Sequence, residues 1–335
     1  MARTERWMDA SIIIATYNRS VSLKRTLTSL ATMEVSPDIS WEAIVVDNNS
    51  KDGTKRVVED FIGESGFKLK YLFEKEQGKS FALNSGSKAA QGEFLVYTDD
   101  DVIVHTDWLK NVMKAFRDTQ AACVGGKIHL EWEKPRPPWL NANFFGHLGY
   151  LDLGDNPIKL STRENYRDYG PRLYGANIAV RSSVAEKSGF FNTEMGPKAD
   201  KMYNAEDIHF IDTLIRSGED VYYIPDIIVN HCIPGKNLKK KYFRKREFHQ
   251  GEARGIQWGS YKSKHILGTP LYIFNEFGID VMKYLWSLIT KPVEAFNDQI
   301  RLSHYIGFFS GRYKYTKSLD VPRKWIQLAD LPEQA

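Results

Sequence analysis

Hydrophobic residues in the first half of the chain follow two alternating patterns, short continuous runs and runs with helical spacing. The continuous runs have the length of buried strands and cover Ser11–Ala15, Glu42–Val46, Leu69–Phe73 and Glu93–Tyr97. After the first of them, Leu23, Leu27 and Leu30 recur at the i, i+4, i+7 spacing of one helix face. Strands that alternate with helices are typical of βαβ units. The pattern therefore predicts an α/β fold with a mostly parallel sheet flanked by helices.

The rest of the chain continues this alternation around one irregular segment. Further helices are expected around Val57–Phe61, Ser80–Ala90, Trp108–Phe116 and Glu206–Ser217. Strands or turns are expected at Tyr174–Arg181, Val221–Ile224 and Ile227–Val229. The segment Glu131–Tyr174 contains EKPRPPWL and is rich in Gly and Asn, so we expect a long, mostly irregular excursion. Such excursions in compact domains usually serve a function.

Polar clusters follow three of the predicted strands at their carboxyl ends. They are Thr16-Tyr17-Asn18-Arg19, Asp47-Asn48-Asn49 and Asp99-Asp100-Asp101. Ligands of open α/β sheets bind beyond the carboxyl ends of the strands. Because parallel strands end at the same edge, we expect the three clusters to lie together and to form the functional site.

The aspartate triplet places three like charges directly after a buried strand. Carboxylate oxygens suit Mg2+ or Mn2+, hard cations that commonly join one or two carboxylates to the phosphates of a substrate. A solvated turn, or Asp101 as the cap of the next helix, is the competing interpretation. The two companion clusters favour a metal site.

Two further motifs admit both a binding and a turn interpretation. Asp47 ends the second strand and is suited to accept hydrogen bonds from a ribose or a base edge, although Asp, Asn and Ser also favour turns. Lys79 follows Gln77-Gly78 ahead of a helix, where it could bind a phosphate. The spacing is not that of a P-loop, and a glycine turn with a serine cap explains the motif equally well.

Two acidic residues and a histidine complete the candidate set. Glu206 and Asp207 open a predicted helix, where the helix dipole favours acids in any case. One of them could be a general base for a substrate hydroxyl. His231 follows an apolar strand and could bind a metal or a phosphate, but such a histidine is more often structural.

The C-terminal part combines a basic run, Lys236–Arg246, with an apolar stretch, Leu271–Ile289. Glu276, Asp280 and Lys283 share one face of that stretch, which predicts an amphipathic helix. It could pack on the catalytic domain, on a partner subunit or on a membrane surface, the first being commonest. The net charge of +4 is too small, and the basic run too short, to indicate nucleic acid. Anionic lipid or a pyrophosphate is the better match to the basic run.

Cysteine content and hydropathy bear on the compartment. Cys123 and Cys232 are too few for a disulfide framework or a zinc site, which favours a reducing compartment. The N-terminal residues lack the apolar region of a signal peptide. No uncharged apolar run reaches the roughly 18 to 20 residues that span a bilayer. We therefore expect a cytoplasmic protein that can associate with the inner face of the plasma membrane.

Together the motifs resemble those of the family 2 glycosyltransferases, inverting enzymes with the GT-A (nucleotide-diphospho-sugar transferase) fold. The matching stretches are SIIIATYNR, IVVDNNSKDGT, GKSFALNSG, GEFLVYTDDDV, YGANIAVR and NAEDIHF. The resemblance implies a GT-A domain over residues 1–235. Residues 236–335 would then form a basic and amphipathic helical C-terminal extension.

The resemblance also implies an activity and a role for individual residues. One sugar would move, with inversion, from a nucleotide-sugar donor, UDP-sugar favoured, to a hydroxyl of a saccharide or lipid-linked acceptor in cell-surface polysaccharide or glycoconjugate synthesis. Asp207 would be the catalytic base, with Glu206 beside it. Mn2+ or Mg2+ would be held by Asp100, Asp101 and His231. The donor would be bound by Ala15, Tyr17, Arg19, Asp47, Asn49, Lys79, Asn84, Asp99, Asp100, Gly175 and Asn177.

One departure and two rival classes limit this interpretation. The QxxRW motif of the processive synthases is absent, which favours transfer of one sugar per encounter. A nucleotidyltransferase of similar α/β fold would also use metal-binding aspartates, although ATYNRSVSLKR lacks its glycine-rich basic signature. A non-catalytic membrane-associated adaptor would need no metal at all.

Overall fold

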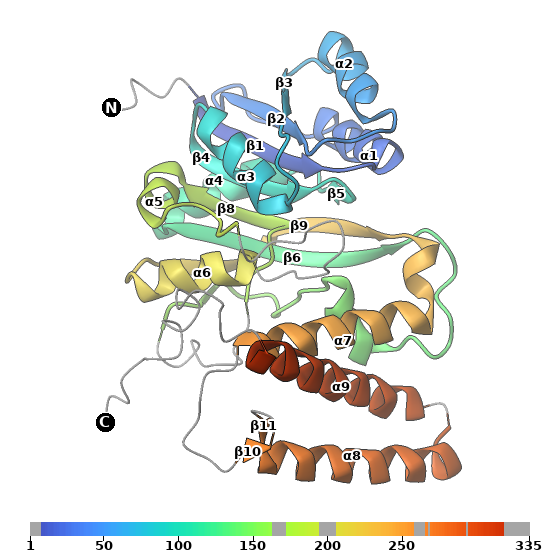
Figure 1. Cartoon of the computed structure of the whole chain (residues 1–335). Coiled ribbons are helices and arrows are strands. Elements are labelled where there is room, and N and C mark those ends of the chain that lie inside the picture. Colours follow the sequence, from blue (N-terminus) through green and yellow to red (C-terminus); the bar gives the residue numbers. More distant parts are fainter. Residues whose placement is uncertain are drawn as a thin grey trace. The chain divides into compact units, whose positions relative to one another are not determined.

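The computed structural model describes residues 8–162, 172–193, 206–257, 265–266, 269–292 and 294–317 (Figure 1). Asn204, which begins the NAEDIHF stretch, part of the excursion before Tyr174, and the end of the C-terminal extension lie outside these residues. Contacts divide the chain into two compact units. The first, here the sheet unit, lies within residues 1–133, 145–200 and 204–233; the second, the helical unit, lies within 134–144, 201–203 and 234–335.

The described part of the sheet unit is built on a nine-stranded sheet. Its strands are β1 (Met8–Thr16), β2 (Trp41–Asp47), β3 (Lys68–Phe73), β4 (Gly92–Asp99), β5 (Val102–Val104), β6 (Cys123–Trp132), β7 (Ile158–Lys159), β8 (Asn177–Arg181) and β9 (Val221–Ile233). They are ordered β3-β2-β1-β4-β8-β6-β9-β5, and β7 pairs with β9. The pairs β2–β3, β1–β2, β1–β4 and β6–β9 are parallel, while β8, β5 and β7 are antiparallel to their neighbours. The predicted mostly parallel sheet is thus confirmed.

Helices of the sheet unit bury the apolar faces that their spacing predicts. They are α1 (Ser20–Ala31), α2 (Thr54–Glu64), α3 (Lys79–Ala89), α4 (Trp108–Thr119), α5 (Ser182–Ser188) and α6 (Glu206–Arg216). The 3₁₀ turn η1 (Ala142–Leu148) of the excursion begins in the helical unit and ends in the sheet unit. Leu23, Leu27 and Leu30 of α1 are buried in one core with the isoleucines of β1. Burial of this apolar face is the main source of stability for such helices.

Strand register brings the three polar clusters to one edge, as the sequence predicts. Ala15 of β1 lies opposite Val46 on one side and Asp99 on the other, and Thr16 lies opposite Asp47. The ends of β1, β2 and β4 are therefore level with one another. Every side chain that follows these strands starts from the same boundary of the sheet.

Two strands differ from the sequence prediction. The two expected runs at Val221–Ile224 and Ile227–Val229 form one strand, β9, with a register shift opposite Gly126 and Lys127. Pro225, which cannot donate to a ladder, falls within this irregularity. A side chain at Gly126 would overlap the carbonyl oxygen of Ile227, so the glycine permits the close approach. The three-residue β5, too short to be seen in the hydrophobic pattern, pairs Val102 with His231.

The helical unit contains α7 (Lys240–Gln257), α8 (Leu271–Thr290) and α9 (Ala295–Lys317), with the short elements η2 (Gly235–Leu238), β10 (His265–Ile266) and β11 (Thr269–Pro270). Within this unit α9 lies between α7 and α8 (Figure 1). Part of the expected excursion belongs here. Trp139 packs edge-on against Phe243 of α7 and Phe296 of α9, with ring centroids 5.5 and 5.0 Å apart.

Helices α7 and α9 touch through glycines. Each carries a pair spaced by four residues, Gly251 and Gly255 on α7 and Gly307 and Gly311 on α9. A Cβ added at any of the four would overlap a backbone carbonyl oxygen of the other helix. The two backbones are therefore in direct contact, the packing that small-xxx-small motifs permit.

The third helix, α8, confirms the predicted amphipathic segment but turns its polar face inward. Asp280 is 3% exposed and accepts hydrogen bonds from Arg301 at 2.6 Å and Lys283 at 3.3 Å. The Tyr284 hydroxyl accepts a hydrogen bond from Gln299 at 3.2 Å. The apolar face, expected to pack within the protein, is instead largely exposed. None of the described helices combines the length and apolar character needed to cross a bilayer.

The glycine contact generates a prediction with an internal control. Gly307→Ala should destabilise the helical unit by roughly 1–3 kcal/mol, because its methyl group would overlap the Phe248 carbonyl and force the two helices apart. Gly278→Ala on α8 meets no atom within 4 Å and should be neutral or stabilising by about 0.5–1 kcal/mol. Chemical denaturation of both variants checks this. Equal stability of the two would refute the backbone contact.

Candidate active site

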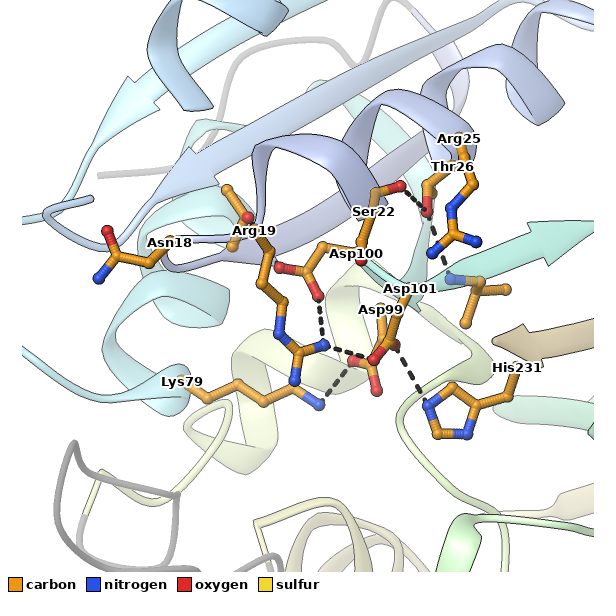
Figure 2. Close-up of polar contacts among 12 residues, drawn as sticks. Asn18, Arg19, Ser22, Arg25, Thr26, Lys79, Asp99, Asp100, Asp101 and His231 are labelled. Carbon is orange, nitrogen blue, oxygen red and sulfur yellow. Dashed lines mark hydrogen bonds and ion pairs between the residues drawn. The ribbon is translucent and has the colours of Figure 1, made fainter. Parts of the chain in front are cut away.

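Arg19 binds two of the three aspartates that end β4. Its Nη1 lies 3.0 Å from Asp100 Oδ1 and also donates a hydrogen bond to Asp101 (Figure 2). Asp100 Oδ2 accepts a 2.7 Å hydrogen bond from the Thr16 hydroxyl. Asp100 and Asp101 are only 5% and 9% exposed. They therefore do not form the solvated turn of the competing interpretation. Nor does Asp101 cap a helix, because β5 follows it.

His231 reaches the same cluster from β9. The pairing of Val102 with His231 places its ring beside Asp101, with Nε2 3.2 Å from Oδ1. Its Nδ1 lies 2.8 Å from the carbonyl oxygen of Leu148. Since a carbonyl only accepts, Nδ1 carries a proton, and Nε2 is the atom directed at the carboxylate.

Lys79 offsets the negative charge of Asp99, the third aspartate of the cluster. Its Nζ lies 2.6 Å from Asp99 Oδ1 and 3.7 Å from Glu206 Oε1. The second polar cluster positions this lysine, because the Asn48 side chain accepts a hydrogen bond from the Gly78 backbone at 2.8 Å. The Asn48 amide also donates to the carbonyl of Glu76 at 2.6 Å. The loop ahead of α3 is thus fixed to the end of β2.

Burial and pairing move the pKa values of this cluster in opposite directions. Burial raises the pKa of Asp100, and Arg19 only partly offsets it. For Asp101 burial would also raise the pKa, but His231 and Arg19 more than offset it and hold the carboxyl below its ordinary value. Burial alone would lower the pKa of His231, whereas Asp101 raises it overall. An ionised Asp101 is therefore held against a histidine and an arginine.

Glu206 and Asp207 differ sharply although they are adjacent. Asp207 accepts backbone hydrogen bonds from Gly175 at 2.9 Å and from Ile208 at 2.8 Å, so both of its oxygens are held. Burial nevertheless raises its pKa, and Lys79 opposes the rise. Glu206 is 2% exposed, and its Oε2 has no hydrogen-bond partner among the described residues. Burial raises the pKa of Glu206 to about 8, against the opposing charge of Lys79.

The remaining predicted donor-binding residues fall into two groups. Ala15, Tyr17, Asp47 and Asn49 belong to the same sheet edge; Tyr17 is 40% exposed, and Asn49 adopts a positive φ of 67°. Asn84 and Asn177 use their side chains within the protein. Asn84 exchanges two hydrogen bonds with the Phe191 backbone, at 2.8 and 3.0 Å. Asn177 accepts from the Trp108 indole and donates to two carbonyls, at 2.8 to 2.9 Å. A donor contact by either stays a prediction.

Three groups that support the site were not selected from the sequence. The Thr16 hydroxyl holds Asp100, the Tyr71 hydroxyl donates to Asp47 at 2.8 Å, and the Leu148 carbonyl fixes the tautomer of His231. Thr16 lay in the first polar cluster and could have been chosen by its position at a strand end. Nothing in the sequence marks a backbone carbonyl in an irregular segment.

The donor set fits a divalent cation that shares its coordination with a substrate. No three His, Cys, Asp or Glu side chains within the described ranges converge closely enough to hold an ion by themselves. Asp101 and His231 nevertheless present an oxygen and a nitrogen 3.2 Å apart. One or two protein ligands are the usual share when phosphates supply the others. The chemistry of this pair suits Mn2+ or Mg2+.

Comparison with known proteins identifies the family. The sequence model described as glycosyl transferase family 2 matches residues 11–186, more than half of the chain. The chain belongs to glycosyltransferase family 2. The match covers the ends of β1, β2 and β4 and the Asn177 strand, so most of the site lies in the family region. The resemblance predicted from the motifs is thereby confirmed.

Curated relatives of this glycosyltransferase span most of its length. The succinoglycan biosynthesis protein ExoM of Rhizobium meliloti (strain 1021) is 26% identical over 243 residues, 72% of each chain. Glycosyltransferase AglE of Haloferax volcanii is 25% identical over 236 residues, 70% of each chain. The family 2 chain is accordingly a glycosyltransferase, as its motifs imply.

Solved structures show the GT-A fold. The mannosyltransferase PcManGT of Pyrobaculum calidifontis, in complex with GDP-Man and Mn2+, superimposes with a TM-score of 0.58 at 19% identity. That match covers 94% of this chain and 89% of the other. S. aureus TarS 1-349 gives a TM-score of 0.51 at 17% identity, covering 92% of both chains. At these identities the structures establish the fold of this glycosyltransferase and nothing finer.

The pKa of Glu206 generates a prediction about stability. Because the folded protein holds this proton up to about pH 8 and the unfolded chain releases it near 4.5, the free energy of unfolding should fall as pH rises between those values. The slope expected for one proton is about 1.4 kcal/mol per pH unit. Glu206→Gln copies the protonated form and should flatten this part of the profile. Denaturant titrations at pH 5, 6, 7 and 8 measure it; parallel profiles for both proteins would contradict the assignment.

Proposed function

We propose that this family 2 enzyme is an inverting, metal-dependent glycosyltransferase that moves one sugar from a nucleotide-sugar donor to an acceptor hydroxyl. The observation that carries the proposal is the link between the Asp207 carboxylate and the aspartate cluster. Lys79 lies between them, 2.6 Å from Asp99 and 3.7 Å from Glu206, the neighbour of Asp207. A general base and a binding site for a metal and a diphosphate therefore share one polar edge.

Asp207 is suited to be the base. Two backbone N–H groups orient its carboxylate, and its raised pKa makes it a stronger proton acceptor than an ordinary aspartate. We propose that it takes the proton of the acceptor hydroxyl as that oxygen attacks the sugar carbon opposite the leaving nucleotide. Glu206, largely protonated at neutral pH, would leave Lys79 paired with Asp99 and would not compete as a base.

The donor would lie along the ends of β1, β2 and β4. In this arrangement Tyr17 and Asp47 contact the base and ribose, and the Arg19 guanidinium is within reach of the diphosphate. Asp101 and His231 would hold Mn2+ or Mg2+, with Asp100 as the alternative ligand. Such an ion, when bound, offsets the negative charge on the departing diphosphate. GDP-Man with Mn2+ in PcManGT and UDP in a second TarS 1-349 structure, at a TM-score of 0.51, are the nucleotide ligands named for GT-A neighbours. UDP-sugar stays our first choice.

For the acceptor we propose a saccharide or a lipid-linked saccharide at the inner face of the membrane. ExoM is named for succinoglycan biosynthesis, and a Haloferax volcanii relative, 23% identical over 253 residues, is named a glucosyl-dolichyl phosphate glucuronosyltransferase. Both names concern polymers or lipid-linked sugars, which supports this acceptor class. A role in cell-surface polysaccharide or glycoconjugate synthesis follows from it.

A ligand panel tests the donor and the metal. One nucleoside diphosphate among UDP, GDP, CDP and dTDP should raise the melting temperature by several degrees in Mn2+ or Mg2+, because a ligand that binds only the folded state stabilises it. The shift should vanish in EDTA and in Asp101→Asn. A nucleotide shift that persists unchanged in EDTA would remove the metal from the proposal.

Asp207→Asn tests the base. This variant should keep the nucleotide-dependent thermal shift but lose transfer by roughly 10²–10⁴-fold, since the amide cannot accept the hydroxyl proton. Product analysis of the active enzyme should show a nucleoside diphosphate. Release of pyrophosphate would identify a nucleotidyltransferase instead, and full activity of Asp207→Asn would exclude this residue as the base.

A further inference from the structure

One face of α8 exposes a continuous row of apolar side chains, here called the outer face. It consists of Leu271, Ile279, Met282, Leu285, Trp286 and Ile289. The most exposed are Met282 at 67%, Trp286 at 69% and Ile289 at 81%. Three of the six, at positions 271, 282 and 289, are spaced by eleven and seven residues, close to whole numbers of turns, and so lie along one side of a 20-residue helix. Monomeric proteins rarely leave so large a contiguous apolar surface without a partner.

Ion pairs fix this orientation. The opposite side of α8 buries Ile273, Asp280 and Ser287, which recur every seven residues. Asp280 is held by Arg301 of α9 at 2.6 Å, and rotating the helix to bury the apolar row would expose this pair and break it. A buried carboxylate that loses its cationic partner strongly destabilises the fold. The helix is therefore held with its apolar face outward.

Charge is distributed unevenly between the two parts of the chain. Residues 234–335 contain eighteen lysines and arginines against nine aspartates and glutamates, a formal charge of +9. Residues 1–233 contain 28 basic and 33 acidic residues, a formal charge of −5. The exposed apolar helix thus belongs to the strongly basic part of the protein. A surface that binds this helix should have an apolar interior and a negatively charged exterior.

We propose that the outer face of α8 docks into the interfacial region of an anionic phospholipid bilayer, with the helix lying in the membrane plane. A helix of 20 residues would extend about 30 Å along that surface. Trp286 and Tyr272 are amphipathic residues of the kind enriched at this depth. A second copy of the chain is the poorer occupant, because it would bring a second +9 region against the first. Anionic lipid attracts that charge.

This docking rests on the proposed function and adds to it the surface that presents a lipid-linked acceptor. The docking proposal and the proposed function can each fail without the other. Membrane binding needs only the helical unit, whereas donor binding needs only the edge of the sheet unit. Vesicle binding and the nucleotide-dependent thermal shift therefore report on different proposals.

Sedimentation with vesicles tests the docking on the full chain. Wild-type protein should bind vesicles of phosphatidylglycerol and phosphatidylcholine more tightly than phosphatidylcholine alone, and high salt should reduce the difference. The triple variant Met282→Gln, Trp286→Gln, Ile289→Gln should bind at least about tenfold more weakly, since it removes three large apolar contacts. Ile62→Gln is the matched control, because Ile62 of α2 is an exposed apolar residue, 47% exposed, in the sheet unit. It should bind like the wild type.

Brominated lipids measure how deeply Trp286 enters the bilayer. They should quench the fluorescence of the wild type more than that of Trp286→Phe, which keeps an apolar ring but removes the reporter. Both the triple variant and the control should retain the wild-type circular dichroism and nucleotide-dependent thermal shift, which shows that they are folded.

Three results would overturn the docking. One is the absence of wild-type binding to either kind of vesicle, and another is equal binding of the triple variant and the wild type. The third is a wild-type dimer in sedimentation velocity that the triple variant converts to a monomer without change in vesicle binding. That third result would assign the outer face to a second copy.

Discussion

The site depends on the pairing of buried carboxylates with two cations, Arg19 and Lys79. Asp99, Asp100 and Asp101 follow one another at the end of a buried strand, and Glu206 and Asp207 lie at the same edge. In a low-dielectric surrounding, carboxylates without partners would be protonated or would destabilise the fold by several kcal/mol. Arg19 bridges two of them and Lys79 bridges two more. Charge balance thus allows a protein to keep, inside its fold, the groups that a metal and a diphosphate require.

Topology explains why these side chains can meet although they are far apart in sequence. The parallel pairs of β1 with β2 and β4 bring the Arg19 turn, the Asp47 loop and the aspartates level with one another. The antiparallel pairing of β5 with β9 then adds His231 from the other side. Each functional group comes from the end of a different strand, so the sheet sets their spacing and the loops supply their chemistry.

Much of this arrangement could be predicted from the sequence because it follows from strand ends. Four continuous apolar runs located the parallel strands, and the polar residues after them located the edge. The sequence did not indicate that Arg19 would bind the aspartates, since a pairing 81 residues apart depends on tertiary register. It also did not reveal β5, whose three residues carry no periodicity, or that the amides of Asn84 and Asn177 are used within the protein. For α8 the pattern gave the correct helix and faces. It could not say which face is buried, because the Asp280–Arg301 pair joins two helices whose packing the pattern does not contain.

The backbone contact between α7 and α9 also determines how α8 can behave. Because the glycines join α7 and α9 directly, α8 is an excursion of chain between two helices that already hold each other. Its attachment to α9 includes the polar pairs Asp280 with Arg301 and Tyr284 with Gln299, and the rings of Phe274 and Phe277 packed on Phe309. Opening this attachment costs the free energy of a local transition and not that of the whole unit. Amide hydrogens of α8 should accordingly exchange with solvent through an opening of lower free energy than those of the glycine-paired helices.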